Sequence, residues 1–473
     1  MQRLRVALPA SVVALFAARF CVAAMRGPPA DGDLAWQRWL GEQILTSGKL
    51  PTSLGTETFS APGSPWLPQE WLFGIFVAVA QRFALAPAFA LAVALCAVLA
   101  LALLARRATA AGASPLATTL CVVFAGSAML DSFGVRAQVV GWPLLAIFTT
   151  LLERDASWLL CAGVALVWSN IHAGAVLAPL LAAAWSAGVG VRDRGPSRDA
   201  VRASLVAVAT LFAVAMNPFG FGLIAYAASL IRSPIKDFIR EWQPTSFADA
   251  SFVWGALPLL AGVAVWALFE GRRAPQRLCA VLVGLALLGA AARNIPIFAL
   301  IVAPYAALGF TRVLRRLESA RGAPRPLLAV AAAICVTLLA GVTEMRLWQR
   351  TNAPAGSAQL IAQLAALPGT HRLLCQDYAW CGVAVGAPRI RVFLDGRADP
   401  YPLRVWDAAF RIAHGSAGWQ AALQSYGVDA IVARRDTRLS TALRRAARWR
   451  TAGTSGSYEL FVLRATVTAA RNP

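Results

Sequence analysis

The sequence predicts a polytopic α-helical membrane protein of about 11 transmembrane helices with a small α/β soluble domain at its C-terminus. Hydrophobic residues make up 58% of the 473 residues and charged residues only 14%, whereas about a quarter of a soluble domain is charged. The mean hydropathy is +0.60, and apolar runs recur along most of the chain. From about residue 344 onward, short strand-like and helix-like patterns alternate instead.

The apolar runs define the expected spans. Residues 6–25 follow Arg3 and Arg5 and look like a secretory signal, but the run is long enough to span and no small-residue cleavage site follows it. We therefore expect an uncleaved first helix. Residues 70–84 are apolar as well and form either a further span or a juxtamembrane helix. The other candidate spans are 86–105, 115–131, 137–152, 157–169, 173–190, 203–216, 253–269, 278–292, 297–311 and 326–343.

Charge decides the orientation of these spans. When residues 70–84 stay outside the bilayer and the N-terminus is cytoplasmic, the arginine-rich connections all face the cytoplasm. The short external connections then hold only Arg136 and Arg293, which agrees with the positive-inside rule. The expected organisation is a transmembrane module over 1–343, with external loops at 26–85 and 217–252, and an external C-terminal domain over 344–473.

The first external loop is polar, although apolar sequence flanks it on both sides. Asp33 precedes apolar residues at helical spacing, and Gly48 can end the run. This pattern predicts an amphipathic helix on the membrane surface with Asp33 at its N-cap. Capping alone accounts for Asp33 as well as a catalytic role does. The acids of the loop are Asp31, Asp33, Glu42, Glu57 and Glu70.

The C-terminal domain shows strand and helix patterns in alternation. Cys375 and Cys381 either pair in an oxidising compartment or stay free thiols, because no His accompanies them at a metal-ligand spacing. Asp395, Arg397 and Asp399 in FLDGRADPY indicate a turn held by internal ion pairs more than a functional site. The expected strands are 371–375, 389–395, 429–435 and 458–464, and the expected helices are 356–367, 405–413, 418–427 and 440–449.

Polar residues gather at the predicted outer ends of the helices. Asp131 and Arg136 lie between two spans, His172 follows another, Arg293 precedes a further one, and Lys236 lies in the second long loop. Each alone suits a turn or cap, and His172 is either a proton carrier or a helix-end residue satisfied by carbonyls. Together they predict a polar cavity that opens outward above an apolar bundle. Carboxylates there can act as a general base or bind a divalent metal, and cations can hold a phosphate.

Other function classes lack their motifs. The sequence has no G-x-S-x-G, H-E-x-x-H or P-loop pattern, so hydrolase, zinc-protease and ATPase functions have no support. The net charge of +21 raises the question of nucleic acid. The arginines, however, cluster between apolar runs as membrane topology requires, without an aromatic-interleaved basic groove. We expect a lipid bilayer as partner and no nucleic acid.

The first loop resembles that of the C-type (GT-C) membrane glycosyltransferases, in which an acid follows the first span and a Trp opens a juxtamembrane helix. The matching stretches are DLAWQRWLGEQILTSGKLP, which begins at Asp33, and SPWLPQEWL. Two features depart from the family pattern, since Leu34 follows Asp33 in place of a second acid, and Glu70 replaces the usual aromatic or His. The chain is most similar to the branch of aminoarabinose and protein mannosyltransferases. NPFG, IREW, RNIP and VFLDGRADPY resemble uncharacterised bacterial members of the superfamily.

This resemblance implies an inverting glycosyltransferase of the bacterial inner membrane. It would transfer a sugar from a polyprenyl-phosphate-linked donor to a lipid, glycan or protein acceptor on the periplasmic side. The implied catalytic residues are Asp33, Asp31 as its helper or substitute, and Asp131. Asp33 and Asp131 would also hold a divalent cation, Mg²⁺ or Mn²⁺, with Glu57 as a further oxygen ligand. The implied substrate-binding residues are Arg136, His172, Lys236, Arg293 and Glu70.

Two other functions compete with this one. A transporter or flippase for a lipid-linked or anionic substrate would carry charged residues within spans and repeats across two halves. The sequence shows neither beyond Arg19. A noncatalytic assembly or scaffold protein would use its basic C-terminal domain to bind a partner.

Overall fold

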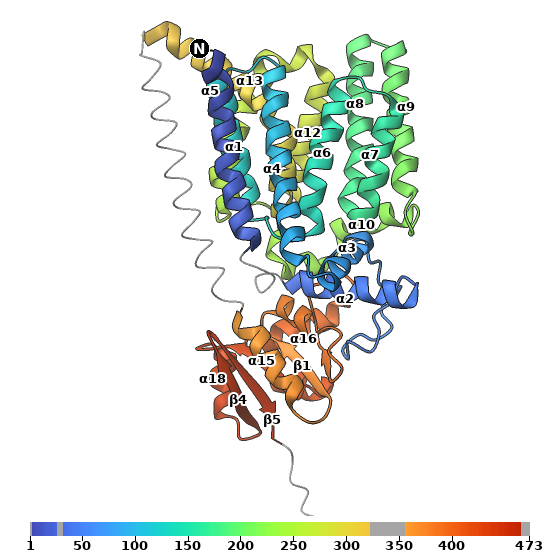
Figure 1. Ribbon diagram of the computed structural model, residues 1–473, viewed down its shortest axis with the longest axis vertical. Coiled ribbons are helices and arrows are strands. Elements are labelled where there is room, and N and C mark those ends of the chain that lie inside the picture. The colour runs from blue at the N-terminus through green and yellow to red at the C-terminus, as the bar shows by residue number, and fades with distance from the viewer. Residues whose placement is uncertain (1, 26–31, 322–354, 465–473) are drawn as a thin grey trace, which may run out of the picture. The chain divides into compact units, whose positions relative to one another are not determined.

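The chain folds into two compact units, which we describe separately. The computed structural model describes residues 2–25, 32–321 and 355–464 (Figure 1). The first unit, here called the helical unit, holds the described residues within 1–25, 69–73 and 83–348. The second, the mixed unit, holds those within 26–68, 74–82 and 349–473. Most of the first loop therefore folds with the C-terminal residues, and the expected boundary at 343–344 lies outside the described residues.

The helical unit consists of apolar helices that lie side by side (Figure 1). Among the described residues, five helices are long and apolar enough to cross a membrane: Leu8–Met25, Ala86–Ala110, Ala173–Asp193, Phe252–Phe269 and Ala292–Leu317. The others are shorter, so the count of 11 spans is not confirmed, and the expected span at 326–343 lies outside the described residues. The helices are α1 Gln2–Met25, α4 Ala86–Ala110, α5 Pro115–Leu130, α6 Ala137–Glu153, α7 Trp158–Ile171, α8 Leu177–Asp193, α9 Arg198–Ala215, α10 Gly222–Arg232, α11 Leu257–Phe269, α12 Pro275–Ala290 and α13 Ile295–Arg321.

Small residues let these helices approach closely. Gly262 of α11 lies against Gly309 of α13, where a Cβ on Gly309 would overlap the Gly262 carbonyl oxygen. Gly255 lies in the same way against Ala128 of α5, where a Cβ on Gly255 would lie 2.6 Å from the Ala128 Cα. Close backbone approach at Gly and Ala is the usual means of packing apolar helices in a membrane. The Ala- and Gly-rich sequence of the helices is therefore part of what packs them.

The second long loop contains more regular structure than the sequence predicts. Helix α10 occupies its first half, and two 3₁₀ turns follow, η3 (Pro234–Phe238) and η4 (Arg240–Trp242). The expected span at 253–269 begins as a π-helix, η5 (Phe252–Ala256), and continues as α11. Helix α10 has only 11 residues, and such a short helix leaves too weak a periodicity to be distinguished from loop.

The mixed unit is built on a five-stranded sheet with the order β2-β1-β3-β5-β4. Strand β1 pairs parallel with β2 and β3, and β5 pairs antiparallel with β3 and β4. Thr58 of the first loop forms a parallel bridge to Val392, which adds this loop to the edge at β2. The strands are β1 His371–Cys375, β2 Ile390–Val392, β3 Ala430–Arg434, β4 Trp449–Ser455 and β5 Tyr458–Leu463. The helices are α2 Gly32–Ser47, α15 Ala355–Ala366, η8 Tyr378–Ala384, α16 Leu403–Ala413, α17 Trp419–Tyr426 and α18 Arg438–Arg445, while α3 Trp71–Arg82 is divided between the two units.

One expected helix of the C-terminal domain is corrected. The pattern at 440–449 predicts a single helix, but α18 ends at Arg445 and strand β4 begins at Trp449. Strands β4 and β5 form a hairpin whose turn contains Gly456 with a φ of +54°. The Gly-Ser dipeptide between them is the turn signal that marks this hairpin.

Helix α2 forms where the sequence predicts a surface helix, but its apolar face is not left for a membrane. Trp36 and Leu40 are buried in one core cluster with Leu360 and Leu373. The helix begins at Gly32, so Asp33 lies in its first turn rather than at the N-cap. Gly48 follows the last helical residue with a φ of +68°, as expected of a terminating glycine.

Candidate functional site

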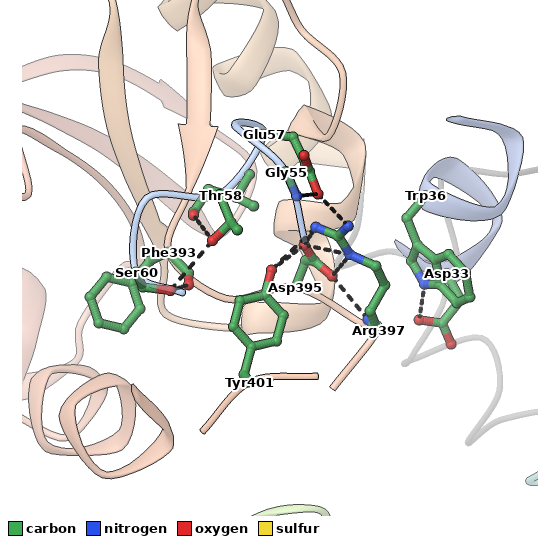
Figure 2. Close-up of polar contacts among 11 residues, drawn as sticks. Asp33, Trp36, Gly55, Glu57, Thr58, Ser60, Phe393, Asp395, Arg397 and Tyr401 are labelled. Atoms are coloured by element: carbon green, nitrogen blue, oxygen red, sulfur yellow. Dashed lines mark hydrogen bonds and ion pairs between the residues drawn. The ribbon is translucent and has the colours of Figure 1, made fainter. Parts of the chain in front are cut away.

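The carboxylate of Asp33 lies against the C-terminal segment 395–399, which we call the DGRAD turn (Figure 2). Asp33 Oδ1 accepts a hydrogen bond from Trp36 Nε1 at 3.1 Å. Gly396 adjoins the same oxygen so closely that a Cβ there would overlap it. The first turn of a helix also favours a negative charge. The expected catalytic acid is thus fixed by its own helix and by the DGRAD turn.

The DGRAD turn is organised around a buried arginine. The side chain of Arg397 is fully buried, and its Nε and Nη2 donate to the two oxygens of Asp395 at 2.9 and 2.6 Å. Arg397 Nη1 donates to Glu57 Oε1 of the first loop at 2.7 Å, and Tyr401 Oη donates to Asp395 Oδ2 at 2.6 Å. The expected turn held by ion pairs is confirmed. Its link to Glu57, 340 residues away, was not predicted.

Burial and charge act in opposite directions on the pKa of Arg397. Burial alone lowers the pKa of Arg397, but the charge of Asp395, with contributions from Tyr401 and Glu57, raises the pKa well above its usual value. Burial, reinforced by Asp395, also raises the pKa of Tyr401, so its phenol stays a donor. Glu57, which the resemblance implied as a metal ligand, is here the partner of a buried cation.

Three tryptophans connect α2 to the same arginine. The Arg397 guanidinium carbon lies 5.3 Å from the ring centroid of Trp39 and 5.1 Å from that of Trp66. Trp36 meets Trp66 edge to face at 6.1 Å between centroids. Cations over indole faces are attracted by the ring quadrupole, more strongly where water is excluded. The indoles therefore hold α2 and the DGRAD turn in one arrangement.

The start of α2 is enclosed on another side by η8. A Cβ at Gly32 would overlap the carbonyl oxygen of Ala379, and one at Gly382 would overlap that of Gly32. Cys375 and Cys381 form a disulfide across this segment. Of the two states that the sequence allows for these cysteines, the structure has the disulfide.

A second group of expected site residues lies in the helical unit. Asp131 follows α5, and its Oδ2 accepts from the backbone N–H of Ser251 at 3.1 Å, directly before the π-helix η5. Single π-helical turns occur often at functional sites. Arg136 precedes α6, and its Nη1 lies 3.9 Å from Glu241 Oε2. The second long loop therefore touches both ends of the α5–α6 connection.

Arg293 joins this group through the same loop. It lies in η7 (Ala292–Asn294), and its guanidinium carbon is 5.4 Å from the ring centroid of Trp242. Trp242 Nε1 donates to Glu241 Oε1 at 3.3 Å. Arg136 and Arg293, both expected to bind phosphate, are thus connected through Glu241 and Trp242. Lys236 lies half-buried in η3, and no contact recorded among the described residues joins it to this pair.

His172 lies between α7 and the 3₁₀ turn η2 (Ala173–Val176) and faces Glu70, which precedes α3. His172 Nδ1 accepts from the Gly174 N–H at 2.9 Å, and its Nε2 lies 3.8 Å from Glu70 Oε1. Gln69 Oε1 accepts from the Ala173 N–H at 2.7 Å and so holds the end of the first loop at this break. Burial, followed by the charge of Arg293, lowers the pKa of His172 to about 3. A neutral imidazole with its proton on Nε2, toward Glu70, fits this geometry.

The expected site residues are thus divided between the two units. Asp33 belongs to the mixed unit, Asp31 lies outside the described residues, and the other six belong to the helical unit, namely Asp131, Arg136, His172, Lys236, Arg293 and Glu70. Residues 32–321 and 355–464 contain no group of three or more His, Cys, Asp or Glu that could hold a metal ion. The residues described do not form a metal centre, and we derive no step through a metal.

Sequence reasoning missed Gly396, Trp242 and the ion pair between Glu57 and Arg397. The DGRAD motif was recognisable as an ion-paired turn, but its own residues say nothing of which distant segment it meets. The available signals were the acid Glu57 in the first loop and Arg397 just after an apolar strand. Only the fold shows that these two residues form an ion pair.

No family model and no curated protein matches this sequence. Several solved structures share its fold. The archaeal oligosaccharyltransferase AglB from Archaeoglobus fulgidus, in complex with an inhibitory peptide and a dolichol-phosphate, has a TM-score of 0.60 and 15% identity, over 90% of this chain and 69% of that one. The Archaeoglobus fulgidus oligosaccharyltransferase in complex with Zn and sulfate has a TM-score of 0.57 and 15% identity, over 90% and 68%.

The third structure is a mutant of the arabinofuranosyltransferase AftD from Mycobacteria, with a TM-score of 0.52 and 17% identity, over 96% of this chain and 41% of that one. The neighbours are GT-C membrane glycosyltransferases. At these identities the likeness by itself shows a shared fold and nothing further about this chain. With the apolar helices, it points to a multi-pass membrane protein.

Proposed function

We propose that this protein is an inverting membrane glycosyltransferase that moves a sugar from a polyprenyl-phosphate-linked donor to a lipid, glycan or protein on the periplasmic side of a bacterial inner membrane. The observation that carries the proposal is a GT-C fold in which the acid after the first helix is half-buried against a turn and accepts a hydrogen bond from an indole N–H. A fold neighbour bound to a dolichol-phosphate supports a lipid-phosphate donor. Similarity to the aminoarabinose and protein mannosyltransferase branch stays part of the proposal.

Asp33 is the general base of this mechanism. Its carboxylate takes the proton of the acceptor hydroxyl or amine while that atom forms a bond to the anomeric carbon of the donor sugar. The bond from that carbon to the phosphate oxygen breaks, and the polyprenyl phosphate leaves with the electron pair. Attack opposite the leaving group inverts the anomeric carbon. Asp31 is a helper to Asp33 in this proposal, and Asp131 is a second catalytic carboxylate, held by Ser251.

The cations of the helical unit bind the donor phosphate. Arg136 and Arg293 border Glu241 and Trp242, and Lys236 supplies a further charge from the same loop. Charge-assisted hydrogen bonds from guanidinium to phosphate are strong and directional. Neutral His172 donates through Nε2, and Glu70 orients it. The lipid tail needs an apolar surface, which the exposed helix faces offer.

The first test removes the gene and measures glycans and lipids of the membranes by mass spectrometry. Wild type should restore a sugar-sized mass that the deletion loses, and Asp33→Asn should not. Glu42→Gln is the matched control, because Glu42 is an acid of the same helix whose carboxylate forms an exposed ion pair with Arg82. Restoration by Asp33→Asn would remove Asp33 from the mechanism and favour transport or scaffolding.

The phosphate site has its own test. Membranes of the deletion strain supply endogenous donor and acceptor, and purified protein is added to them. Loss of one charge-assisted contact should cost about 1.5–3 kcal/mol, so Arg293→Gln should slow transfer roughly ten- to a hundredfold. Arg272→Gln, an exposed arginine of the 3₁₀ turn Gly271–Arg273, should leave transfer unchanged. Equal rates for both variants would contradict the assignment.

The predicted divalent cation is tested in the same membranes. If a divalent cation takes part, EDTA should stop transfer and added Mg²⁺ or Mn²⁺ should restore it. Asp131→Asn should then raise the cation concentration needed for half-maximal rate. Full transfer in EDTA would remove the cation from the proposal and leave the general-base role of Asp33 intact.

A further inference from the structure

We infer that the DGRAD turn is a positioning element for Asp33, in which Gly396 sets the place of the carboxylate and Arg397 fixes Gly396. This inference rests on the proposed function, since it assumes that the Asp33 carboxylate reacts. It adds that the C-terminal part of the chain, far from Asp33 in sequence, is needed to aim that carboxylate. Neither Gly396 nor Arg397 is a catalytic residue in this account.

Space, not backbone conformation, requires a glycine at 396. Gly396 is not among the described residues with a positive φ, so its backbone is open to any L residue. A Cβ would overlap Asp33 Oδ1 and would lie 3.3 Å from Trp36 Nε1. The missing side chain therefore makes room for one carboxylate oxygen and its hydrogen-bond donor. Figure 2 shows the hydrogen bond between Asp33 and Trp36.

Hydrogen bonds hold the backbone of the DGRAD turn in place. Asp395 and Arg397, on either side of Gly396, are joined by three side-chain hydrogen bonds and by one from the Arg397 N–H to Asp395 Oδ1 at 3.0 Å. Arg397 is tied further to Glu57, and the Ala398 carbonyl accepts from Trp406 Nε1 at 3.3 Å. Ala398 has a φ of +60°, a left-handed conformation that persists only where surroundings impose it.

The start of α2 is equally confined from the side of η8. A Cβ at Gly32 would overlap the Ala379 carbonyl, and one at Gly382 would overlap the Gly32 carbonyl, so neither glycine has room for a side chain. The main chains on both sides of the Asp33 carboxylate are thus anchored. When a methyl group is added at Gly396, the part that moves is the carboxylate, which is the distal end of a side chain. Gly396→Ala should consequently fold and should displace the reacting group.

The mixed unit offers a matched control for this variant. Gly453 lies in β4 with no positive φ, and a Cβ there would overlap the side-chain oxygen of Gln363, an exposed residue. Gly453→Ala makes the same chemical change against the same kind of atom, away from Asp33. The two variants therefore differ in which side chain they displace. The Cβ at 453 would also lie 3.2 Å from the buried Leu360, just as the one at 396 would lie 3.3 Å from Trp36.

The experiment has a spectroscopic part that does not depend on transfer. Full-length protein labelled with ¹⁵N-Trp is studied by NMR in detergent, and the indole N–H signal of Trp36 is assigned with Trp36→Phe. Because Trp36 Nε1 donates to Asp33, its shift follows the position and protonation of that carboxylate. We expect Gly396→Ala to move the Trp36 signal and its pH midpoint, and Gly453→Ala to leave both in place.

Transfer is measured in the deletion-strain membranes with the same variants. A misplacement of about 1 Å can cost about a hundredfold in rate, so Gly396→Ala should lower the maximal rate ten- to a hundredfold with the half-saturating membrane concentration unchanged. Gly453→Ala should match wild type. An inactive Asp33→Asn with a fully active Gly396→Ala would overturn the positioning role while leaving the proposed function.

Two other outcomes also count against the inference. Equal losses in Gly396→Ala and Gly453→Ala would show a general packing effect. Full activity of Asp33→Asn would show that the Asp33 carboxylate does not react, which defeats the proposed function and this inference together. In that case the Trp36 signal still reports separately whether Gly396 bounds the carboxylate.

Discussion

Each of the two units contains a buried arginine bound to a carboxylate that also accepts from a tyrosine. In the helical unit, Arg107 binds Glu153 through Nε and Nη2 at 3.0 and 2.8 Å, and Tyr305 Oη donates to Glu153 at 2.6 Å. In the mixed unit, Arg397 binds Asp395 in the same two-pronged way, and Tyr401 takes the place of Tyr305. The arginine side chains are 3% and 0% exposed.

The two clusters differ in the third partner of the arginine. Arg107 Nη1 donates to the backbone carbonyl of Leu300 at 2.9 Å, whereas Arg397 Nη1 donates to the carboxylate of Glu57. The Leu300 carbonyl would normally accept from the N–H of residue 304, but that residue is Pro304, inside α13. Arg107 therefore replaces a missing helix hydrogen bond. Arg397 instead joins two segments that are far apart in sequence.

This difference shows two uses of a buried cation. In an apolar helix bundle, backbone groups left without partners are costly, and an arginine from a neighbouring helix satisfies one of them. In the mixed unit, a cation between two carboxylates fixes a loop on a domain and, by our inference, fixes the proposed base. The first use stabilises the helix bundle alone, and the second also positions the proposed catalytic base.

The largest expected effect is that of Arg397→Met. It leaves the carboxylates of Asp395 and Glu57 buried without their cation, which should cost about 3–5 kcal/mol of folding free energy. Limited proteolysis of the mixed unit at rising temperature, followed by mass spectrometry, measures the loss. Arg389→Met, an exposed arginine of the same unit, is the control and should change little. A small loss for Arg397→Met would mean that the cluster does not hold the loop.

Arg107→Met should cost less, about 1.5–3 kcal/mol, because it leaves one carboxylate rather than two. The free cysteines among the described residues all lie in the helical unit, and Cys121 and Cys161 are buried. Their reaction with a thiol dye during heating therefore reports the opening of this unit alone. Arg106→Met, the exposed neighbour, is the control. A cost equal to that of Arg397→Met would break the comparison between the clusters.

A smaller effect concerns the pH dependence of the stability of the mixed unit. Burial, followed by the hydrogen bond to Asp377, raises the pKa of Tyr458 to about 12. An unfolded tyrosine has a pKa of about 10, so between these values the folded state keeps a proton that the unfolded state loses. The mixed unit should therefore lose stability as pH rises from about 10 to 12. Tyr458→Phe should reduce this dependence in fluorescence-detected unfolding, and Tyr401, whose pKa is also raised, accounts for the remainder. An unchanged slope would exclude Tyr458 as a source.

Periodicity and caps predicted the local structure well. Helix α4 begins at Ala86 and α5 at Pro115, where the apolar runs begin, and Gly48 follows α2 as expected. The strand at 449–455 and helix α10 were missed because short elements carry few periods. The lateral contacts of Asp33 were not predictable, since a run of residues specifies its own geometry but not the distant partner that meets it.

The last prediction concerns Pro304. A proline inside a helix indicates that the carbonyl four residues earlier lacks its helix hydrogen bond, but the sequence does not show which donor replaces it. Pro304→Ala supplies an N–H to the Leu300 carbonyl. In wild type that carbonyl already accepts from Arg107, so the new bond adds little beyond helix propensity. In Arg107→Met it replaces a lost partner and should recover about 0.5–1.5 kcal/mol more than it does in wild type. A double-mutant cycle in the thiol-dye assay isolates this excess. Equal gains in both backgrounds would show that Arg107 does not substitute for the missing helix hydrogen bond, and would reduce its role to the ion pair with Glu153.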